Sequence, residues 1–438
     1  MLPALSALPL AWADPASVFA GGPAAERHAF WLDAGPDAAN GWSWIGIGEP
    51  ETDAAAVRSV ALGTPRAAAC EWGPFHGGWV GWIGYDGAAG RAGRAGAPHH
   101  ADTAVPEEMW LRATRFVAFD HSQGRMWAVA PAAEVEAFAA QAAAWASAPR
   151  PLLTPAAPRV ARARVSASAY ARRIEQCRDA IREGDAYQLC LTTRFDVVAA
   201  EPIDPVAAHL RLRASSPAHH GGLIRSDDVA LVSASPERFL EAADGLVRTR
   251  PIKGTRPRGT DADTDAALAA ELQASPKERA ENVMIVDLMR NDLSRVCAPA
   301  SVAVDALLSV ESYPAVHQLV SAVSGRLLPH VTVGELLAAT FPAGSMSGAP
   351  KLSAMTILHR LEAAPRGVFA GCFGWVGADG ALDLAMVIRS IVVHPGGAYV
   401  GAGGGITWGS DPAAEVAEVA VKARAPLAAL GAHVPPGW

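Results

Sequence analysis

Short apolar runs bounded by glycine and proline constrain the fold of this 438-residue chain more than any other feature. In the first third, such runs at Phe30 to Leu32, Trp42 to Gly46 and Gly78 to Tyr85 have the length and the boundaries of β-strands. They predict an antiparallel, β-rich N-terminal region. No apolar run reaches the roughly 18 residues that a membrane span needs, so we expect no membrane partner.

Helical and strand-like patterns alternate in the remainder of the chain, which indicates an α+β fold. Helices are predicted over residues 168–183, 275–296, 350–364 and 412–430, and strands over 229–233, 385–393 and 398–401. A Gly- and Ala-rich stretch at 87–104 predicts a mobile loop. The composition shift between residues 140 and 164 marks a boundary between an N-terminal region, 1–150, and a second region, 164–431.

Charge and cysteine usage limit the kinds of partner. The net charge is -7 and the basic residues are scattered, which argues against nucleic acid and anionic membranes and favours a small-molecule substrate. The apolar N-terminus lacks the leading basic residue of a signal peptide. Five widely spaced cysteines without a C-x-x-C pair indicate reduced thiols and a cytoplasmic protein: Cys70, Cys177, Cys190, Cys297 and Cys372.

Two carboxylate pairs have helical spacing. Glu278 and Glu281 lie three residues apart near the start of one predicted helix, and Glu415 and Glu418 repeat the spacing on the last helix, with Lys422 four residues further on. Residues three apart share a helix face. Each pair alone is more often a solvated acidic face. Facing a cleft, the pairs would need a cation, and their oxygen-only donors suit Mg²⁺.

Two glycine-rich segments are candidate anion sites. Gly401 to Gly405 lies between a strand-like run and a helix, where successive backbone amides can converge on a carboxylate or phosphate, although a tight turn is an equal alternative. The segment 341–351 brings Ser345 and Ser347 to a helix start.

Lys253 lies in a basic stretch. Arg248, Arg250, Arg256 and Arg258 flank it, and cationic neighbours or a desolvating pocket favour the neutral amine that a nucleophile requires. A nearby anion site or a basic surface turn would explain the same residues, and the surface turn is favoured by residue chemistry alone.

Taken in order, the long motifs of the second region resemble the chorismate-utilising family. That family contains anthranilate synthase component I, aminodeoxychorismate synthase component I, and the isochorismate and salicylate synthases. The resemblance is carried by GDAYQLCLTTRF, ASPERF, RPIKGT, ERAENVMIVDLMRNDLSRVC, FPAGSMSGAPK, LDLAMVIRSI and GAGGGI with the Glu-x-x-Glu-x-x-x-Lys helix. FWLDAG and GGWVGWIGYD extend it more loosely into the N-terminal region.

The resemblance implies a fold and a set of site residues. The implied fold is α+β, with antiparallel β-sheets packed as a sandwich and helices outside. Mg²⁺ would be bound directly by Glu281 and Glu418 and through water by Glu278 and Glu415, and Glu237 would protonate the departing C4 hydroxyl of chorismate. The implied substrate-binding residues are Arg389, Gly403, Gly404, Gly405 and Lys422, together with Gln188, Ser345 and Phe369.

Two positions select a branch of the family. Gln188 stands where the isochorismate and salicylate branches carry a water-activating lysine, and Lys253 stands where anthranilate synthases carry alanine. The resemblance therefore implies the aminodeoxychorismate branch: the lysine attacks C2, the C4 hydroxyl leaves, and ammonia from a separate glutamine amidotransferase subunit, component II, adds at C4. This transaminase-class amination would serve 4-aminobenzoate and folate synthesis.

Two alternatives stay open at this point. The nearer one is anthranilate synthase component I, and the other is a non-catalytic chorismate-binding subunit. One difference from the anthranilate branch is Ala34, which replaces a serine of that branch's tryptophan-binding element and weakens the case for tryptophan feedback.

Overall fold

The computed structural model describes residues 3–36, 38–63, 70–96, 99, 104–313 and 316–438. Within these residues, 20 strands form one hydrogen-bonded network in which the strand pairs are antiparallel. The network branches at the long strand β5 (Glu108–Asp120), whose first half pairs with β4 (Gly78–Ile83) and whose second half pairs with β3 (Trp42–Pro50). Two sheets therefore diverge from one strand.

The first sheet continues from β3 through strands of both sequence regions to β8. Its further members are β2 (His28–Asp33), β9 (His220–Ser226), β10 (Val229–Ser235), β19 (Ser390–His394), β20 (Gly397–Ile406) and β8 (Gln188–Val198). The second sheet continues from β4 through β17 (Cys372–Gly377), β18 (Leu382–Met386), β11 (Arg238–Ala243), β12 (Leu246–Thr249) and β15 (Val316–Arg326), and β13 (Ile252–Pro257) and β14 (Ala303–Ser312) both pair with β15.

Successive side chains of each strand point to opposite faces of the sheet, and this divides the hydrophobic core into two layers. In β2, Phe30 and Leu32 belong to a cluster that also contains Leu240 and Leu384 of the second sheet, whereas Trp31 faces the cluster beneath the helices. Successive side chains of a strand point to opposite faces, so one strand can serve both layers. The expected sandwich with outer helices is confirmed.

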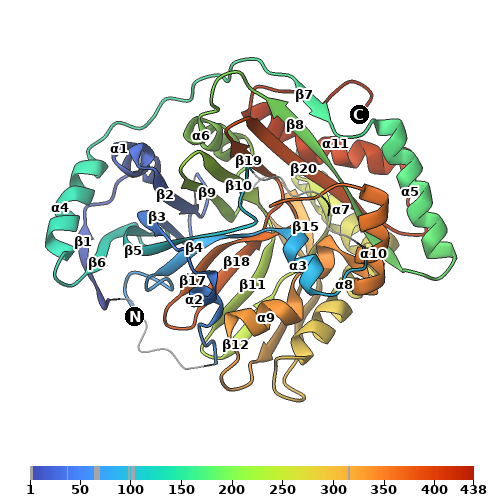
Figure 1. Ribbon diagram of the computed structural model, residues 1–438, viewed down its shortest axis with the longest axis horizontal. Helices are drawn as coiled ribbons and strands as arrows, with labels where there is room; N and C mark the ends of the chain where they lie inside the picture. Colours follow the sequence, from blue (N-terminus) through green and yellow to red (C-terminus); the bar gives the residue numbers. More distant parts are fainter. Residues whose placement is uncertain (1–2, 37, 64–69, 97–98, 100–103, 314–315) are drawn as a thin grey trace.

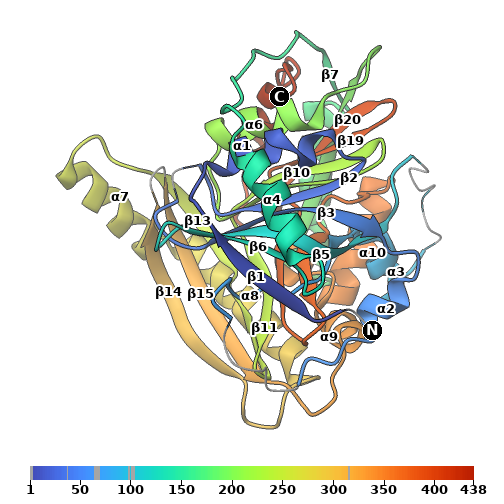
Figure 2. The same cartoon turned by 90° about the vertical axis from the view of Figure 1, so that its left-hand side faces the viewer.

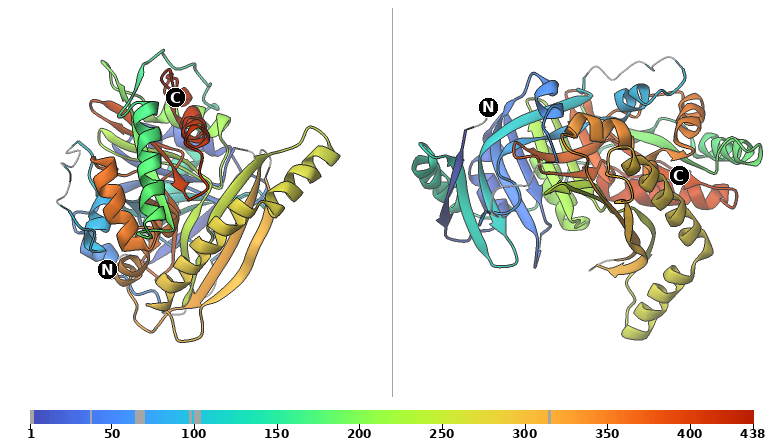
Figure 3. Two further views of the ribbon diagram at one scale, coloured as in Figure 1. Left: turned by 90° about the vertical axis from the view of Figure 1, so that its right-hand side faces the viewer. Right: turned by 90° about the horizontal axis from the view of Figure 1, so that it is seen from below.

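Helices cover the outer faces (Figure 1). One group lies over the first sheet: α1 (Pro15–Gly21), α5 (Ala167–Arg182), α6 (Pro205–Ser215), α10 (Lys351–Glu362) and α11 (Pro412–Ala429). α4 (Val135–Ala146) packs on α1 and on β6 (Arg125–Pro131), which pairs with β5. α8 (Pro276–Ser294) packs on β13, β14 and β15 of the second sheet, and α9 (Val333–Thr340) packs on α8. Figure 3 shows α5, α8 and α10 on one side of the molecule. Within the described ranges, none of these helices has the length and apolarity to cross a bilayer.

Strands of the two sequence regions pair with each other. β2 pairs with β9 along six residues, Ala29 opposite Arg225 among them, and β4 pairs with β17. The predicted mobile stretch at 87–104 is partly helical, because α3 (Tyr85–Arg91) occupies its start, while residues 97–98 and 100–103 lie outside the described residues. The two regions thus share their sheets.

The predicted strand at 385–393 is wrong as a single strand. β18 ends at Met386 and β19 begins at Ser390, and between them Arg389 adopts a left-handed backbone with φ of 51°. The chain crosses there from the second sheet to the first. A helix that no periodicity predicted, α7 (Ala262–Ala274), projects from the body beside β13 and β14 (Figure 2).

Candidate active site

Two segments that cross between the sheets lie side by side and carry the first two candidate residues. Glu237 lies between β10 and β11, and Arg389 lies between β18 and β19. The Met386 amide donates to the Glu237 carbonyl at 3.0 Å, and the Ala234 amide donates to the Arg389 carbonyl at 3.3 Å. These bonds hold Glu237, the predicted proton donor, close to Arg389, which is predicted to bind a carboxylate of the substrate.

Lys253 and Gln188 meet at Gly405. A Cβ at position 405 would lie 2.3 Å from Gln188 Nε2 and 3.4 Å from Lys253 Nζ, so a larger residue there would push the Gln188 amide aside. Gln188 is 1% exposed, and its Oε1 finds no hydrogen-bond partner among the described residues. A buried acceptor without a donor is costly, which is typical of a position that a ligand completes.

Glu237 has the properties of a proton donor at neutral pH. Burial raises the pKa of its carboxyl to about 7, although Lys253, a hydrogen bond from Ser345 and the charge of Lys422 act in the opposite direction. A carboxylic acid in this range can hold a proton and release it. Ser345 therefore contacts Glu237, and the charges of Lys253 and Lys422 act on its carboxyl.

The glycine-rich segment is a strand rather than a loop. Gly403, Gly404 and Gly405 belong to β20 and pair with β8, opposite Thr192, Leu191 and Cys190. Successive amides of an extended strand point to opposite edges. The amides of Gly403 and Gly405 therefore share one edge of the strand and that of Gly404 faces the other, and the loop interpretation of Gly401 to Gly405 is wrong.

Cationic side chains are available beside this strand. Lys422 Nζ donates to the Gly403 carbonyl at 2.8 Å and pairs with Glu418 Oε1 at 2.6 Å. No hydrogen bond or ion pair joins the Arg389 guanidinium to another described residue, and burial lowers its pKa against the opposing effect of Glu418. Glu418 thus pairs with Lys422 and acts on the charge of Arg389, and either cation could bind a carboxylate.

The carboxylates of α8 and α11 face one another across Lys277. Lys277 Nζ donates to Glu415 Oε1 at 3.1 Å and lies 4.0 Å from Glu281 Oε1. Burial raises the pKa of Glu281, opposed by Lys253 and Lys277, and the charges of Glu278 and Glu415 raise it further. Burial would raise the pKa of Glu418 too, but Lys422, Lys277 and Lys253 together lower it.

The four glutamates of α8 and α11, Glu278, Glu281, Glu415 and Glu418, form an acidic group that is suited to bind a divalent cation. Its donors are carboxylate oxygens, and Glu281 Oε1 is buried without a hydrogen-bond partner among the described residues. In the described part of the chain, no three potential ligands are already grouped as they are around a bound ion. Glu278 is turned toward Arg256, whose Nη1 lies 3.6 Å from Glu278 Oε1. Side-chain rotations would have to bring the oxygens together.

The arginines flanking Lys253 have partners of their own. Arg250 pairs with Glu311, Arg256 with Glu271, and Arg258 with Asp265. Lys253 itself lies on β13, so the basic surface turn is wrong. Three carboxylates, those of Glu237, Glu281 and Glu418, act electrostatically on its amine.

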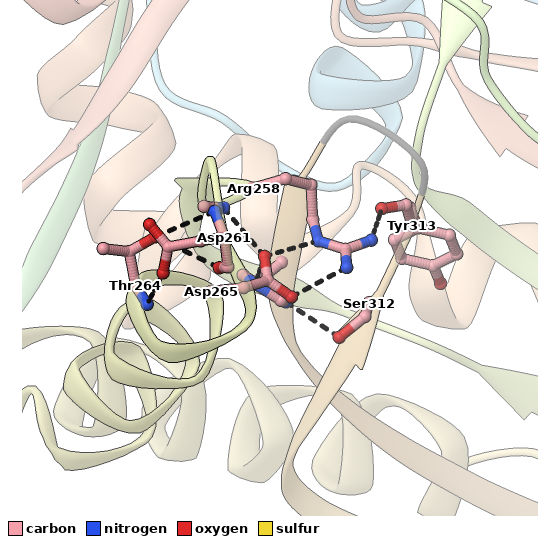
Figure 4. Close-up of polar contacts among 8 residues, drawn as sticks. Arg258, Asp261, Thr264, Asp265, Ser312 and Tyr313 are labelled. Carbon is pink, nitrogen blue, oxygen red and sulfur yellow. Dashed lines mark hydrogen bonds and ion pairs between the residues drawn. The ribbon is translucent and has the colours of Figure 1, made fainter.

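A hydrogen-bonded cluster fixes the segment that follows Lys253 (Figure 4). Asp265 accepts two bonds from Arg258, at 2.8 and 2.7 Å, and one from the Gly259 amide. His317 Nε2 lies 2.9 Å from Asp265 Oδ1, and Ser312 Oγ lies 2.8 Å from His317 Nδ1. These bonds, led by those of Arg258, lower the pKa of Asp265. The cluster anchors α7 to β13, β14 and β15.

Two further predicted site residues, Ser345 and Phe369, are buried. Ser345 is buried on the turn before α10 and contacts Glu237. Phe369 is 5% exposed and fills the space over Gly401, which makes it a packed core residue. A cavity of about 950 Å³ lies elsewhere, between the two sheets beside β2 and β3, and Ala34 is among its lining residues.

Sequence reasoning missed two features of the site. The first is Lys277, although its i, i+4 spacing to Glu281 was visible. The second is a buried ion pair of Glu362 with Arg366, again four residues apart. Glu362 also accepts from the Thr192 amide at 2.9 Å, and Arg366 Nη2 donates to the Cys190 carbonyl at 2.9 Å, which supports β8 from behind the site.

The sequence of the chain is similar to those of known proteins. A family model described as chorismate binding enzyme matches residues 37–428. An aminodeoxychorismate synthase of Streptomyces pristinaespiralis is 43% identical over 344 residues, 74% of this chain and 47% of that protein. An anthranilate synthase component 1 of Streptomyces coelicolor is 40% identical and is covered to 73%, over 82% of this chain.

A solved structure has the same fold. The structure of anthranilate synthase component I from Streptococcus pneumoniae superimposes with a TM-score of 0.74 at 28% identity, covering 97% of this chain and 92% of that one. By contrast, this chain spans about half the length of the Streptomyces pristinaespiralis relative.

Proposed function

The chain belongs to the family of chorismate-binding enzymes, and on this premise we propose that it is the chorismate-aminating component of an aminodeoxychorismate synthase. The reaction converts chorismate and ammonia to 4-amino-4-deoxychorismate, a precursor of 4-aminobenzoate and folate. One observation carries the proposal. Lys253 Nζ and the buried Gln188 amide meet at Gly405, and the lysine charge acts on Glu237, whose pKa burial raises to about 7.

The neighbouring acid explains how Lys253 becomes a nucleophile. A proton that moves from the Lys253 ammonium to the Glu237 carboxylate leaves a neutral amine and a protonated acid, the two forms that the first step consumes. Burial raises the pKa of Glu237 to about 7, so its carboxyl can hold at neutral pH the proton that the first step consumes. Gln188 cannot act as a base, which disfavours activation of water in the same place.

The reaction then runs as two substitutions. The Lys253 amine forms a bond to C2 of the ring, the ring double bonds shift, and the C4 hydroxyl leaves as water with the proton of Glu237. Ammonia next bonds to C4, the double bonds shift back, and the C2–nitrogen bond to Lys253 breaks. Lys253 leaves as the neutral amine, and the proton that the new C4 nitrogen loses returns to Glu237, so both groups are restored for another cycle.

Two sets of charged side chains orient the substrate: the cations Arg389 and Lys422, and the glutamates of α8 and α11. Arg389 and Lys422 bind the pyruvyl carboxylate through charge-assisted hydrogen bonds. Glu281 and Glu418, with Glu278 and Glu415 behind them, would hold Mg²⁺, which neutralises and positions the ring carboxylate when it is bound. Oxygen-only donors and the unpartnered Glu281 oxygen support this metal.

Ammonia is expected to come from a separate glutamine amidotransferase subunit. Two similar proteins carry the designation component 1 or I, which supports a two-component enzyme. With glutamine as nitrogen source the overall reaction is an amination of the transaminase class. Free ammonium should replace the partner at lower efficiency.

The test is product analysis with the purified chain, chorismate, Mg²⁺ and ammonium. The expected product retains the enolpyruvyl group, and Lys253→Ala should abolish its formation, with Arg248→Ala as a matched control that removes an exposed cation of the same stretch. Anthranilate and free pyruvate as products would instead assign the chain to anthranilate synthase. A normal product profile from Lys253→Ala would refute the covalent route.

A further inference from the structure

Lys277 occupies the space between two buried carboxylates that come from different helices. It lies in the first turn of α8, and its side chain reaches across to Glu415 in the first turn of α11. Its Nζ is 3.1 Å from Glu415 Oε1 and 4.0 Å from Glu281 Oε1. The side chains of Glu415 and Glu281 are only 3% and 8% exposed, whereas that of Lys277 is 47% exposed.

We propose that Lys277 is a built-in counter-ion for Glu281 and Glu415, two of the four glutamates that would hold the divalent cation, and that metal binding requires its ammonium group to leave. The inference rests on the proposed function, because that function supplies the expectation of a metal. It assigns to Lys277 a role in setting metal affinity, as a positioning residue that contacts neither the substrate nor the reacting atoms.

Burial of the two carboxylates makes a counter-ion necessary. Two acids held close together and away from water repel each other and lose hydration, and both costs fall when a cation lies between them. Ser410 Oγ donates to Glu415 Oε1 at 2.8 Å, but Glu281 Oε1 has no hydrogen-bond donor among the described residues. Among the described residues, the Lys277 ammonium is the only cation within 4.0 Å of both Glu415 Oε1 and Glu281 Oε1.

The geometry also shows why the lysine is replaceable. At 4.0 Å from Glu281 Oε1 its ammonium is beyond hydrogen-bond distance, so it neutralises that oxygen without binding it. Mg²⁺ binds carboxylate oxygens at about 2.0 to 2.1 Å and would satisfy the same oxygen directly. Lysine has a flexible stem and a well-hydrated head, and the half-exposed side chain of Lys277 has open solvent to enter.

Metal affinity provides the test. Mg²⁺ alone is titrated calorimetrically into the full-length chain without chorismate, for wild type, Lys277→Met and the matched control Arg279→Met. Arg279 lies two residues further along α8 and donates to the Gln273 carbonyl, so its loss removes the same charge away from the acids. Glu281→Gln should abolish the heat of binding, which shows that the measured site is this one.

We expect the dissociation constant for Mg²⁺ to fall by about three- to tenfold in Lys277→Met, because a partly exposed, hydrogen-bonded ion pair no longer competes. Arg279→Met should bind as wild type does. Lys277→Gln, which keeps a polar head without charge, should reproduce the tighter binding, and equal melting temperatures establish that both variants are folded.

The outcomes separate this inference from the function it rests on. Unchanged or weaker Mg²⁺ binding in both Lys277 variants, with Glu281→Gln still abolishing it, overturns the displacement and leaves the metal assignment intact. An equal gain in Arg279→Met would show a long-range charge effect and would also overturn displacement. If the wild-type chain binds no Mg²⁺ at all, both the metal assignment and the inference fall.

Discussion

Replacing Glu237 with Gln should make the protein more stable at alkaline pH while it removes catalysis. Glu237 is 7% exposed, and burial raises its pKa to about 7 from an ordinary value of 4.5. Between these two pH values the folded chain holds a proton that the unfolded chain has released. The free energy of unfolding therefore falls as pH rises through this window and stays low above it.

The size of the effect follows from the same two values. One pKa unit corresponds to roughly 1.4 kcal/mol, so the difference between about 7 and 4.5 amounts to at most roughly 3 kcal/mol. Gln has nearly the same shape and accepts the hydrogen bond of Ser345, but it carries no charge that must be buried. Glu237→Gln should therefore gain about 1 to 3 kcal/mol over wild type at pH 8 and nearly nothing at pH 4.5.

Urea unfolding at pH 4.5, 6 and 8 measures this difference directly. Glu136→Gln is the matched control, because Glu136 is exposed in the first turn of α4 and its loss removes the same charge without relieving burial. In parallel, kcat with ammonium should fall by about 10²- to 10⁴-fold in Glu237→Gln. A stability difference that is the same at pH 4.5 and 8 would refute the raised pKa.

Two further changes probe close packing and burial. Gly405→Ala should lower kcat/KM with ammonium by about 100-fold at an unchanged melting temperature, since the new Cβ would lie 2.3 Å from Gln188 Nε2 and displace it from Lys253; wild-type kinetics would contradict this. Asp292→Asn should cost about 2 to 4 kcal/mol in denaturant unfolding because it leaves the Lys351 ammonium, whose side chain is 15% exposed, with only the Thr340 carbonyl as a partner; a loss below about 1 kcal/mol would contradict this.

Much of the secondary structure was predictable because its signals are local. Ser275 and Pro276 start α8, and Asp411 and Pro412 start α11, in agreement with the preferences for the N-cap and the first helical position. The same local argument placed each acidic pair on one helix face. What it could not show is that the two helices meet, which depends on how α8 packs on the second sheet and α11 on the first.

The sequence predictions are wrong where pairing with a strand distant in the sequence decides the backbone conformation. Gly401 to Gly405 has the composition of a loop, but its pairing with β8 makes it a strand, and a Cβ at Gly405 would press on the Gln188 amide. Arg389 interrupts an otherwise uniform apolar run, and nothing local announces that the chain changes sheets there. Lys277 was overlooked because half of its contacts come from α11.

The two crossing segments that carry Glu237 and Arg389 have a mechanical consequence. Each joins both sheets, and the bonds from Met386 to the Glu237 carbonyl and from Ala234 to the Arg389 carbonyl tie them together. If the layers slide or breathe against each other, the acid and the guanidinium travel as one unit. The distance between Glu237 and Arg389 therefore stays nearly constant during such motions, whereas it would vary if the two residues lay on separate loops.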